Sequence, residues 1–262
     1  MKTACLVGRL VIWIVLALSL ASPAQAGALP PRASIQGFKG NAQSANLSCE
    51  ARSAVDWAAY WGVRIGEKKF LARLPRSSNP DEGFVGNPND AWGNIPPASY
   101  GVYAAPVAEL LRKLGLDANA RRNLDWDDLR GEIAAGRPVI VWVVGQMWKG
   151  MPLKYVSPDG HKTTVARYEH TMVLTGYEPG KVQVMDAYTG ERQTYPLSTF
   201  LASWGTLGRM AVMGGGRVKP QPTQTPAAGA KVEESMQIYL PYLPNGAGAS
   251  AEMVNPDRFN WR

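Results

Sequence analysis

The segment His170-Thr-Met-Val-Leu-Thr-Gly-Tyr-Glu-Pro-Gly-Lys-Val-Gln-Val-Met-Asp186 decides the fold class of this chain. Two apolar, β-branched runs flank Glu178-Pro179-Gly180, and a Pro-Gly pair between such runs is a strong turn signal. The segment therefore predicts an antiparallel hairpin with strands at 170–177 and 181–186.

The register of this hairpin places two polar side chains together. With a turn of three residues, Tyr177 lies opposite Lys181 and Met172 lies opposite Asp186. His170 and Asp186 are then diagonal neighbours on one face, within side-chain reach.

The rest of the compact region predicts helices first and further strands after them. Cap and stop residues delimit each helix: Ser48, Asp125 and Ser198 suit N-caps, Pro106 suits a first turn, and Gly115 and Gly136 suit helix ends. We expect helices at 49–62, 105–114, 126–135 and 198–204, and strands at 138–144 and 209–213. Helices followed by an antiparallel sheet predict the α+β class.

The apolar residues at helical spacing indicate the buried faces. In the first helix they are Ala51, Ala54, Val55, Ala58 and either Trp61 or Gly62, and in the second they are Leu110, Leu111 and Leu114.

Residues 1–26 have the layout of a secretory signal peptide: a positive start, the apolar run 10–20, and Ala24-Gln25-Ala26 as a cleavage signal. The alternative is an uncleaved membrane anchor, but the run is shorter than the ~20 residues that span a bilayer. We expect a secreted or extracytoplasmic protein with no integral membrane span after cleavage. Its formal charge would fall from +7 to +5 with the loss of Lys2 and Arg9.

That modest positive charge favours loose association with an anionic cell surface. Nucleic acid is not an expected partner, because no recognition motif is present. We expect a leader at 27–34, a catalytic domain at 35–214, a Pro-rich linker at 215–230 and a C-terminal tail of unassigned role at 231–262.

Cys49 is the single cysteine that remains once Cys5 leaves with the signal peptide. An unpaired cysteine in an exported chain suggests intermolecular pairing or a reactive thiol. A helix N-terminus lowers the pKa of a thiol, so we expect a reactive thiolate that iodoacetamide labels quickly. The alternative is an inert cysteine that packs as a small apolar residue.

Two histidines compete to be the base. His161 follows the turn sequence Ser157-Pro-Asp-Gly160 and is expected on an exposed loop, whereas His170 opens a strand. Rigid elements position catalytic groups better than loops, which favours His170. A surface histidine without a catalytic role is the alternative.

Asp186 and Gln43 can complete the site. A carboxylate that accepts the imidazole N–H fixes the tautomer and stabilises the charged ring; the alternative for Asp186 is a turn-forming residue before Tyr188-Thr189-Gly190. The Gln43 amide, with the backbone N–H of Cys49, can form an oxyanion hole, although a glutamine in a polar loop is usually just solvated. One cysteine and two histidines match no zinc pattern, so we expect no metal and no cofactor.

Taken together, these residues resemble the stand-alone branch of the bacteriocin-processing, double-glycine type of papain-like cysteine peptidase, over residues 34–213. The matching motifs are Gln43 six residues before a helix-opening Cys49, the two strands that carry His170 and Asp186, Gly83-Phe-Val-Gly86 with Ser99-Tyr-Gly-Val102, and Arg137-Pro-Val-Ile-Val-Trp-Val143. The resemblance implies a papain-like α+β fold, with the cysteine helix packed on the sheet, and a bacterial thiol peptidase or amidase. Many members carry Gly after the cysteine, where this chain has Glu50.

Three functions remain open from the sequence: a Cys-His-Asp hydrolase of peptide or amide bonds, an acyltransferase at the same site, and a catalytically silent peptide- or glycan-binding module. The long Asn/Pro/Gly-rich stretch 79–101 reads equally as one wall of a substrate cleft or as a surface loop. In the silent module, aromatic residues in or beside this stretch would hold the ligand: Phe84, Trp92, Tyr100 and Tyr103.

Overall fold

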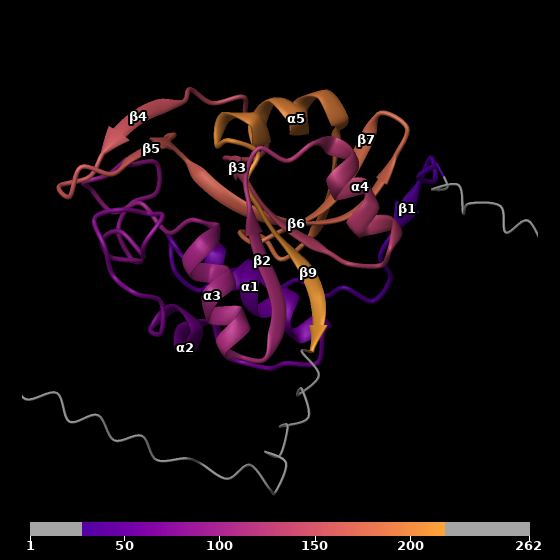
Figure 1. Ribbon diagram of the computed structural model, residues 1–262, viewed down its shortest axis with the longest axis horizontal. Helices are drawn as coiled ribbons and strands as arrows, with labels where there is room; N and C mark the ends of the chain where they lie inside the picture. Colours follow the sequence, from indigo (N-terminus) through magenta and orange to yellow (C-terminus); the bar gives the residue numbers. More distant parts are fainter. Residues whose placement is uncertain (1–27, 218–262) are drawn as a thin grey trace, which may run out of the picture. The chain divides into compact units, whose positions relative to one another are not determined.

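The computed structural model describes residues 28–217, which form a seven-stranded antiparallel sheet covered by helices on both faces (Figure 1). The strand order is β2-β9-β3-β6-β7-β8, and β1 pairs with β6. A separate hairpin pairs β4 with β5. The strands are β1 Ala33–Ser34, β2 Leu116–Arg121, β3 Val139–Val144, β4 Leu153–Val156, β5 Lys162–Val165, β6 Glu169–Glu178, β7 Lys181–Asp186, β8 Arg192–Pro196 and β9 Ala211–Arg217.

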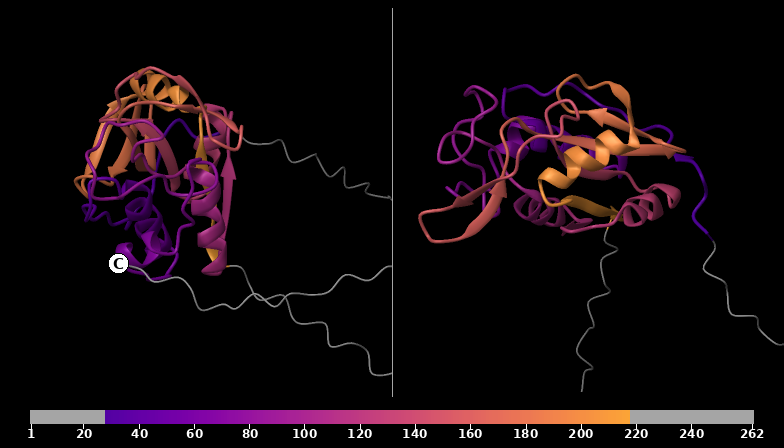
Figure 2. Two further views of the ribbon diagram at one scale, coloured as in Figure 1. Left: turned by 90° about the vertical axis from the view of Figure 1, so that its left-hand side faces the viewer. Right: turned by 90° about the horizontal axis from the view of Figure 1, so that it is seen from above.

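The helices lie in two layers on opposite faces of this sheet. They are α1 Cys49–Tyr60, α2 Glu67–Leu71, α3 Ala104–Lys113, α4 Trp126–Ala134 and α5 Leu197–Thr206. Helices α1 and α3 cover one face, and α4 and α5 cover the other (Figures 1 and 2). The predicted α+β class, with the N-terminal helix packed on an antiparallel sheet, is confirmed.

The predicted helices are confirmed with ends that differ by at most two residues, but two of the expected caps are wrong. Ser48 occupies the N-cap position of α1, yet its hydroxyl donates to Glu67 at 2.6 Å and does not cap the helix. Ser198 lies inside α5, which begins after Pro196. Asp125 does cap α4, and its backbone N–H donates to Asp128 at 2.7 Å in a capping box.

Several short elements were not predicted, because tertiary pairing rather than local pattern forms them. The sequence of β2, Leu-Asp-Ala-Asn-Ala-Arg, is poor in β-formers and is held by its antiparallel pairing with β9. The strands of the β4–β5 hairpin and strand β8 each have five residues or fewer. Helix α2 has five.

At the end of the β6–β7 hairpin away from the turn, Met172 pairs with Asp186 as predicted, but the turn and the strand between differ from the prediction. Glu178 pairs with Lys181, so the turn has two residues and not three. A bulge between Leu174 and Gly176 shifts the register by one residue and brings Met172 opposite Asp186. The two departures cancel, and the predicted diagonal placement of His170 and Asp186 is confirmed.

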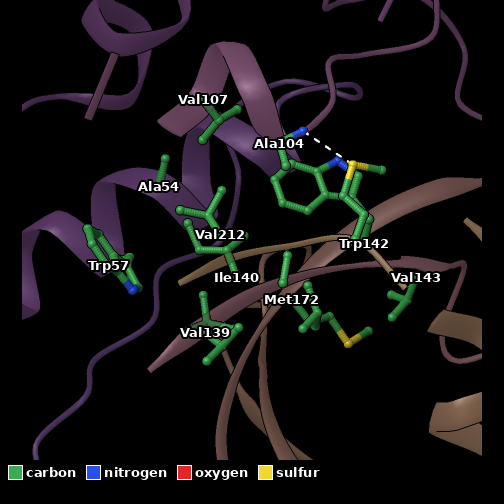
Figure 3. Close-up of a cluster of buried hydrophobic side chains, with 14 of the residues drawn as sticks. Ala54, Trp57, Ala104, Val107, Val139, Ile140, Trp142, Val143, Met172 and Val212 are labelled. Atoms are coloured by element: carbon green, nitrogen blue, oxygen red, sulfur yellow. Dashed lines mark hydrogen bonds between the residues drawn. The ribbon is translucent and has the colours of Figure 1, made fainter. Parts of the chain in front are cut away.

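The core fills both faces of the sheet, and Figure 3 shows part of it between α1, α3 and the centre of the sheet. All six residues of β3 are buried, as expected for a central strand. Ala51, Ala54, Val55 and Ala58 of α1 are buried as predicted, whereas Trp61 is partly exposed and Gly62 is exposed. Trp57, which the pattern did not single out, is fully buried and donates to the Pro138 carbonyl at 2.7 Å. Leu110 and Leu111 of α3 are buried, whereas Leu114 is partly exposed.

The domain extends past its predicted bounds at both ends. Residues 33–34, expected in a leader, form β1 and pair with Tyr177 and Gly176. Tyr177 also donates to the Pro30 carbonyl at 2.8 Å. Strand β9 continues to Arg217. The expected signal peptide, most of the linker and the tail lie outside the described residues. Within residues 28–217, no helix combines the length and apolar character that crossing a membrane requires.

The buried indole of Trp142 on β3 generates a stability prediction. Its Nε1 donates to the Val102 carbonyl at 3.0 Å and its ring is fully buried beside Ala104 (Figure 3). We expect Trp142→Ala to lower the free energy of unfolding by roughly 3–5 kcal/mol in urea denaturation, because it leaves a cavity and an unpaired carbonyl. The control Val156→Ala removes an exposed side chain and should change it by less than about 0.5 kcal/mol. Equal losses in the two variants would contradict this assignment of the core.

Candidate active site

The side chains of His170 and Asp186 form a buried hydrogen bond between neighbouring strands. His170 Nε2 lies 2.6 Å from Asp186 Oδ1, and both side chains are almost fully buried. His170 is near the start of β6 and Asp186 is the last residue of β7, so two paired strands hold the two groups. With Nε2 bound to the carboxylate, the ring presents Nδ1 as its second nitrogen.

The Asp186 carboxylate is fixed by donors beyond the imidazole. Oδ1 also accepts the backbone N–H of Tyr188 at 2.9 Å, and Oδ2 accepts from Thr189 Oγ1 at 3.3 Å and Gln193 Nε2 at 3.1 Å. Burial alone would raise the pKa of Asp186, but the hydrogen bond and charge of His170, with these further donors, lower it below its ordinary value. Asp186 is therefore an ionised acceptor at neutral pH, suited to orient His170.

A cleft of about 300 Å³ opens in front of the imidazole. It is lined by Gln43, Asn46, Trp92, Gln146, Trp148, His170 and Tyr188, which come from four separate loops and the start of β6. Trp92 belongs to the stretch 79–101, so that stretch contributes a wall of the cleft. Phe84, Tyr100 and Tyr103 are instead buried in the core, which contradicts the idea that they are free to hold a ligand.

Gln43 reaches the cleft, but its amide hydrogens are engaged locally. Nε2 donates to the carbonyls of Ala45 at 2.8 Å and Asn46 at 2.9 Å, while Oε1 is buried with no hydrogen-bond partner among residues 28–217. The backbone N–H of Gln43 donates to the Ala187 carbonyl at 2.8 Å, which ties this loop to the residue after Asp186. The oxyanion role of Gln43 stays a prediction.

Buried acids on α1 and α2 hold the Gln43 loop in place. Glu67 accepts the backbone N–H of Ser44 at 2.9 Å, and Asp56 accepts the backbone N–H of Asn41 at 3.0 Å. Arg52 pairs with both carboxylates. These residues position the segment that joins Gln43 to Cys49, and the sequence pattern did not single them out.

Cys49 opens α1 as predicted, but its surroundings do not favour the reactive thiolate that the sequence suggested. The residue is 4% exposed, and Sγ donates to Glu50 Oε2 at 3.2 Å. Burial raises the pKa of the thiol well above its ordinary value, and the charges of Glu50 and Glu169 raise it further. The expected lowering by the helix N-terminus is contradicted, because desolvation and two carboxylates outweigh it.

The thiol and the imidazole face different sides of strand β6. Alternate residues of a strand point to opposite faces. Thr171 is buried against α1, where its hydroxyl lies 3.0 Å from that of Ser53, while His170 shares the other face with Asp186. Cys49 is not among the residues that line the cleft, and within residues 28–217 no hydrogen bond joins it to His170.

Glu50 and Glu169 form a buried acid pair beside the thiol. Glu50 Oε1 accepts the backbone N–H of Val102 at 2.6 Å, and Glu169 Oε1 is buried with no hydrogen-bond partner in the described part of the chain. Burial raises the pKa of Glu50 to about 7, and burial together with the charge of Glu50 raises the pKa of Glu169 well above its ordinary value. Two neighbouring carboxyls in this position retain protons that exposed acids would lose. Gly101 lacks the Cβ that would overlap Glu50 Oε1.

Ligand atoms of Cys49, Glu50 and Glu169 lie within 4.8 Å of one another, which is the geometry of a three-ligand metal site. Their raised pKa values oppose the deprotonation that metal binding needs. The sequence-based expectation of no metal stays a prediction.

The sequence missed the residues that support the site. Gln193, Trp148 and Glu169 carry no recognisable motif. Gln193 reaches Asp186 from the neighbouring strand β8, whereas Trp148 and Glu169 act through contacts with segments distant along the chain. Glu50 stands where many members of the family carry Gly. Its carboxylate accepts a hydrogen bond from the Cys49 thiol. His161, expected on an exposed loop, is about half exposed between β4 and β5 and lies 3.4 Å from Asp81, away from the cleft.

A buried His–Asp pair at the ends of two paired strands of an antiparallel sheet, with a cysteine at the start of the helix packed on that sheet, defines a papain-like cysteine peptidase fold. The model of the Peptidase_C39 like family matches residues 35–212. The chain belongs to this family and is a cysteine-type peptidase, which makes a peptide its substrate. No curated protein matches the chain in sequence.

Solved structures share this fold at low identity. A structure from Bacillus anthracis, classed as a C39-like peptidase, has a TM-score of 0.62 and 22% identity and covers 72% of this chain and 98% of its own. The peptidase domain of Streptococcus ComA, a bifunctional ABC transporter, has a TM-score of 0.42 and 16% identity, covering 69% and 99%. Xylellain, a cysteine protease from Xylella fastidiosa, has a TM-score of 0.39 and 14% identity, covering 73% and 88%. We draw nothing from the last two, because their similarity is too low.

The buried acid pair generates a pH-dependence prediction. The pKa of Glu50 is raised from 4.5 to about 7, so the folded state keeps a proton that the unfolded chain loses first, and stability falls as pH rises through this window. We expect wild type to lose roughly 3 kcal/mol through Glu50 between about pH 5 and about pH 8. Glu50→Gln should show a smaller fall in urea denaturation.

The matched control is Glu82→Gln, which removes an exposed carboxylate and should keep the wild-type pH dependence. A Glu50→Gln variant that loses as much stability as wild type over this range would show that Glu50 ionises normally in the fold.

Proposed function

We propose that this protein is a secreted peptidase that cleaves peptide bonds with Cys49 as nucleophile, His170 as general base and acid, and Asp186 as the group that orients His170. The observation that carries the proposal is the 2.6 Å His170–Asp186 contact at a cleft. The next residue of the strand, Thr171, lies with its hydroxyl 3.0 Å from that of Ser53 on the helix that begins at Cys49. Family membership supports the reaction class, and the contact between His170 and Asp186 supports the roles proposed for these two residues.

The resting thiol must leave its carboxylate partner for this reaction. Sγ donates to Glu50 in the described conformation, so the proposal requires the Cys49 side chain to turn about χ1 toward the cleft when substrate binds. His170 then takes the thiol proton on Nδ1 as sulfur attacks the carbonyl carbon. The imidazolium is stabilised by Asp186, whose carboxylate stays ionised.

The reaction then proceeds in two balanced halves. The tetrahedral adduct collapses to a thioester as His170 gives its proton to the leaving amine, and the C–N bond breaks. Water, deprotonated by His170, attacks the thioester and releases the acid, and the proton returns to sulfur. The backbone N–H of Cys49 and the Gln43 amide would stabilise the oxyanion, which requires Gln43 to release the Ala45 or Asn46 carbonyl.

Export and loose cell-surface association are part of this proposal. Their support is the signal-like layout of residues 1–26 and the positive charge of the chain. Fractionation of a culture expressing the full-length chain tests them: a protein retained inside the cell at its full mass of 28.4 kDa contradicts export.

Substitution of the three proposed catalytic residues tests the mechanism. We expect Cys49→Ala to abolish turnover of a quenched-fluorescent peptide library, because it removes the sulfur that attacks the carbonyl carbon. His170→Ala and Asp186→Asn should lower kcat/KM by roughly 10²–10⁴-fold, the size of a general acid–base contribution. His161→Ala, an exposed histidine away from the cleft, is the control and should keep wild-type activity.

Retained turnover in Cys49→Ala would refute the nucleophile. If the His161 variant lost as much activity as the His170 variant, the base assignment would be wrong. Added glycinamide during the assay separates hydrolysis from acyl transfer: a new peptide bond to the amine would show a transferase.

The acid pair makes a separate prediction about thiol reactivity. In wild type we expect iodoacetamide to label Cys49 more slowly than a free thiol at neutral pH, since burial, Glu50 and Glu169 raise its pKa. The double variant Glu50→Gln/Glu169→Gln removes both carboxylates, so its labelling profile should move to lower pH. Labelling followed by mass spectrometry measures this, and an unchanged profile would show that the two acids do not set the reactivity of the thiol.

A further inference from the structure

Three aromatic rings pack together beside the imidazole of His170. The ring centroids of Trp92 and Trp148 are 6.0 Å apart, and Tyr168 meets them edge-on at 5.2 and 5.4 Å. Trp92 also lies edge-on to His170 at 6.0 Å. The rings come from three loops that the sheet brings together: the stretch 79–101, the loop after β3, and the residue before β6. We call Trp92, Trp148 and Tyr168 the aromatic cluster.

The aromatic cluster is held rigidly by backbone contacts. Trp92 Nε1 donates to the Glu169 carbonyl at 2.8 Å, and the Tyr168 carbonyl accepts the backbone N–H of Gly145 at 2.7 Å. Gly145 has a φ of +50°, and a Cβ there would overlap the Trp148 ring. Tyr168 itself has a φ of +60°, a strained conformation for a bulky residue that turns its ring toward the two indoles.

The aromatic cluster is partly exposed to solvent, whereas rings that only stabilise a core are buried. Trp148 is 48% exposed and Tyr168 is 41% exposed, although both are large and mainly apolar. Trp92 and Trp148 line the same cleft as His170, and Tyr188, 59% exposed, lines its other side. A rigid, exposed aromatic surface that continues into a cleft beside a catalytic base is the form of a ligand site.

The charge around this surface selects among possible occupants. Apart from His170, every side chain that lines the cleft is uncharged. A charged side chain would lose water there without gaining an ion-pair partner. Lys149 follows Trp148 and Arg167 precedes Tyr168 in the chain, and both would repel a basic side chain. Glu169, which follows Tyr168, is buried beside Cys49. An uncharged, apolar side chain fits best.

On the basis of the proposed peptidase function, we propose that Trp92 and Trp148 form a substrate subsite that holds an aromatic or branched aliphatic side chain of the peptide, close to the bond that is cleaved. Tyr168 is a positioning residue that holds the two indole rings. The enzyme is then selective for peptides with an apolar residue near the cleavage point, and it discriminates against peptides with a charged residue there.

A set of quenched-fluorescent peptides tests the subsite. Each peptide carries Phe, Leu, Gly, Lys or Glu at one position within three residues of the cleaved bond. For the full-length wild type we expect one position at which Phe or Leu exceeds Gly in kcat/KM by roughly tenfold or more, and exceeds Lys and Glu as well. In Trp148→Ala the ratio of Phe to Gly should fall toward one, whereas Trp148→Phe should retain most of it.

The controls separate the subsite from general damage. Val156→Ala removes an exposed apolar side chain that does not line the cleft and should keep the wild-type ratio. Tyr168→Ala should lower the ratio as Trp148→Ala does, and Tyr168→Phe, which keeps the ring, should restore it. A preference for Lys, the absence of a preference at every position, or a ratio unchanged in Trp148→Ala would each overturn the subsite.

A binding assay keeps this test independent of turnover. If wild type cleaves none of the peptides, the proposed function fails, and the subsite is then judged on Cys49→Ala by titrating intrinsic tryptophan fluorescence with the Phe and Lys peptides. Tighter binding of the Phe peptide that is lost in Cys49→Ala/Trp148→Ala supports the subsite. Equal binding of the two peptides refutes it.

Discussion

The hydrogen bond between His170 and Asp186 is the contact on which the proposed chemistry depends. It requires the two residues to share a face of the sheet, and β6 and β7 bring them there through a two-residue turn and a bulge whose register shifts cancel. A one-residue slip would send one of the two side chains to the opposite face. The donors from Tyr188, Thr189 and Gln193 then keep the carboxylate ionised and fixed, so the imidazole is oriented before any substrate arrives.

The nucleophile is governed by a different balance. A helix N-terminus favours a thiolate, but desolvation and the acid pair Glu50–Glu169 favour the neutral thiol, and the second effect is larger in the described conformation. A catalytic cycle that begins from a neutral thiol needs His170 to remove the proton during attack. The acid pair thus connects the stability of the fold and the reactivity of the sulfur to the same proton equilibrium.

The sequence predicted where the proposed catalytic residues lie in the fold more reliably than it predicted the protonation state of the thiol. The two apolar runs in 170–186 were enough to predict the hairpin, and His170 lies beside Asp186 because the shorter turn and the bulge cancel. The cap-like stretch before Cys49 was enough to predict a helix that begins there. The prediction that the pKa of the Cys49 thiol is lowered was wrong, because it considered only one local effect, the helix N-terminus. The opposing carboxylate of Glu169 is 120 residues away in sequence and reaches Cys49 only through the packing of α1 on β6.

By itself, the sequence determined the α+β class, the central strand β3, the hairpin and the three residue types of the proposed triad, since these follow from periodicity, turn chemistry and short-range spacing. Only the tertiary structure decided that the thiol is buried against two acids, and that Trp92, Trp148 and Tyr168 meet beside His170. The physical reason is that burial, desolvation and ring packing depend on which distant segments become neighbours, and no local pattern along the chain records that.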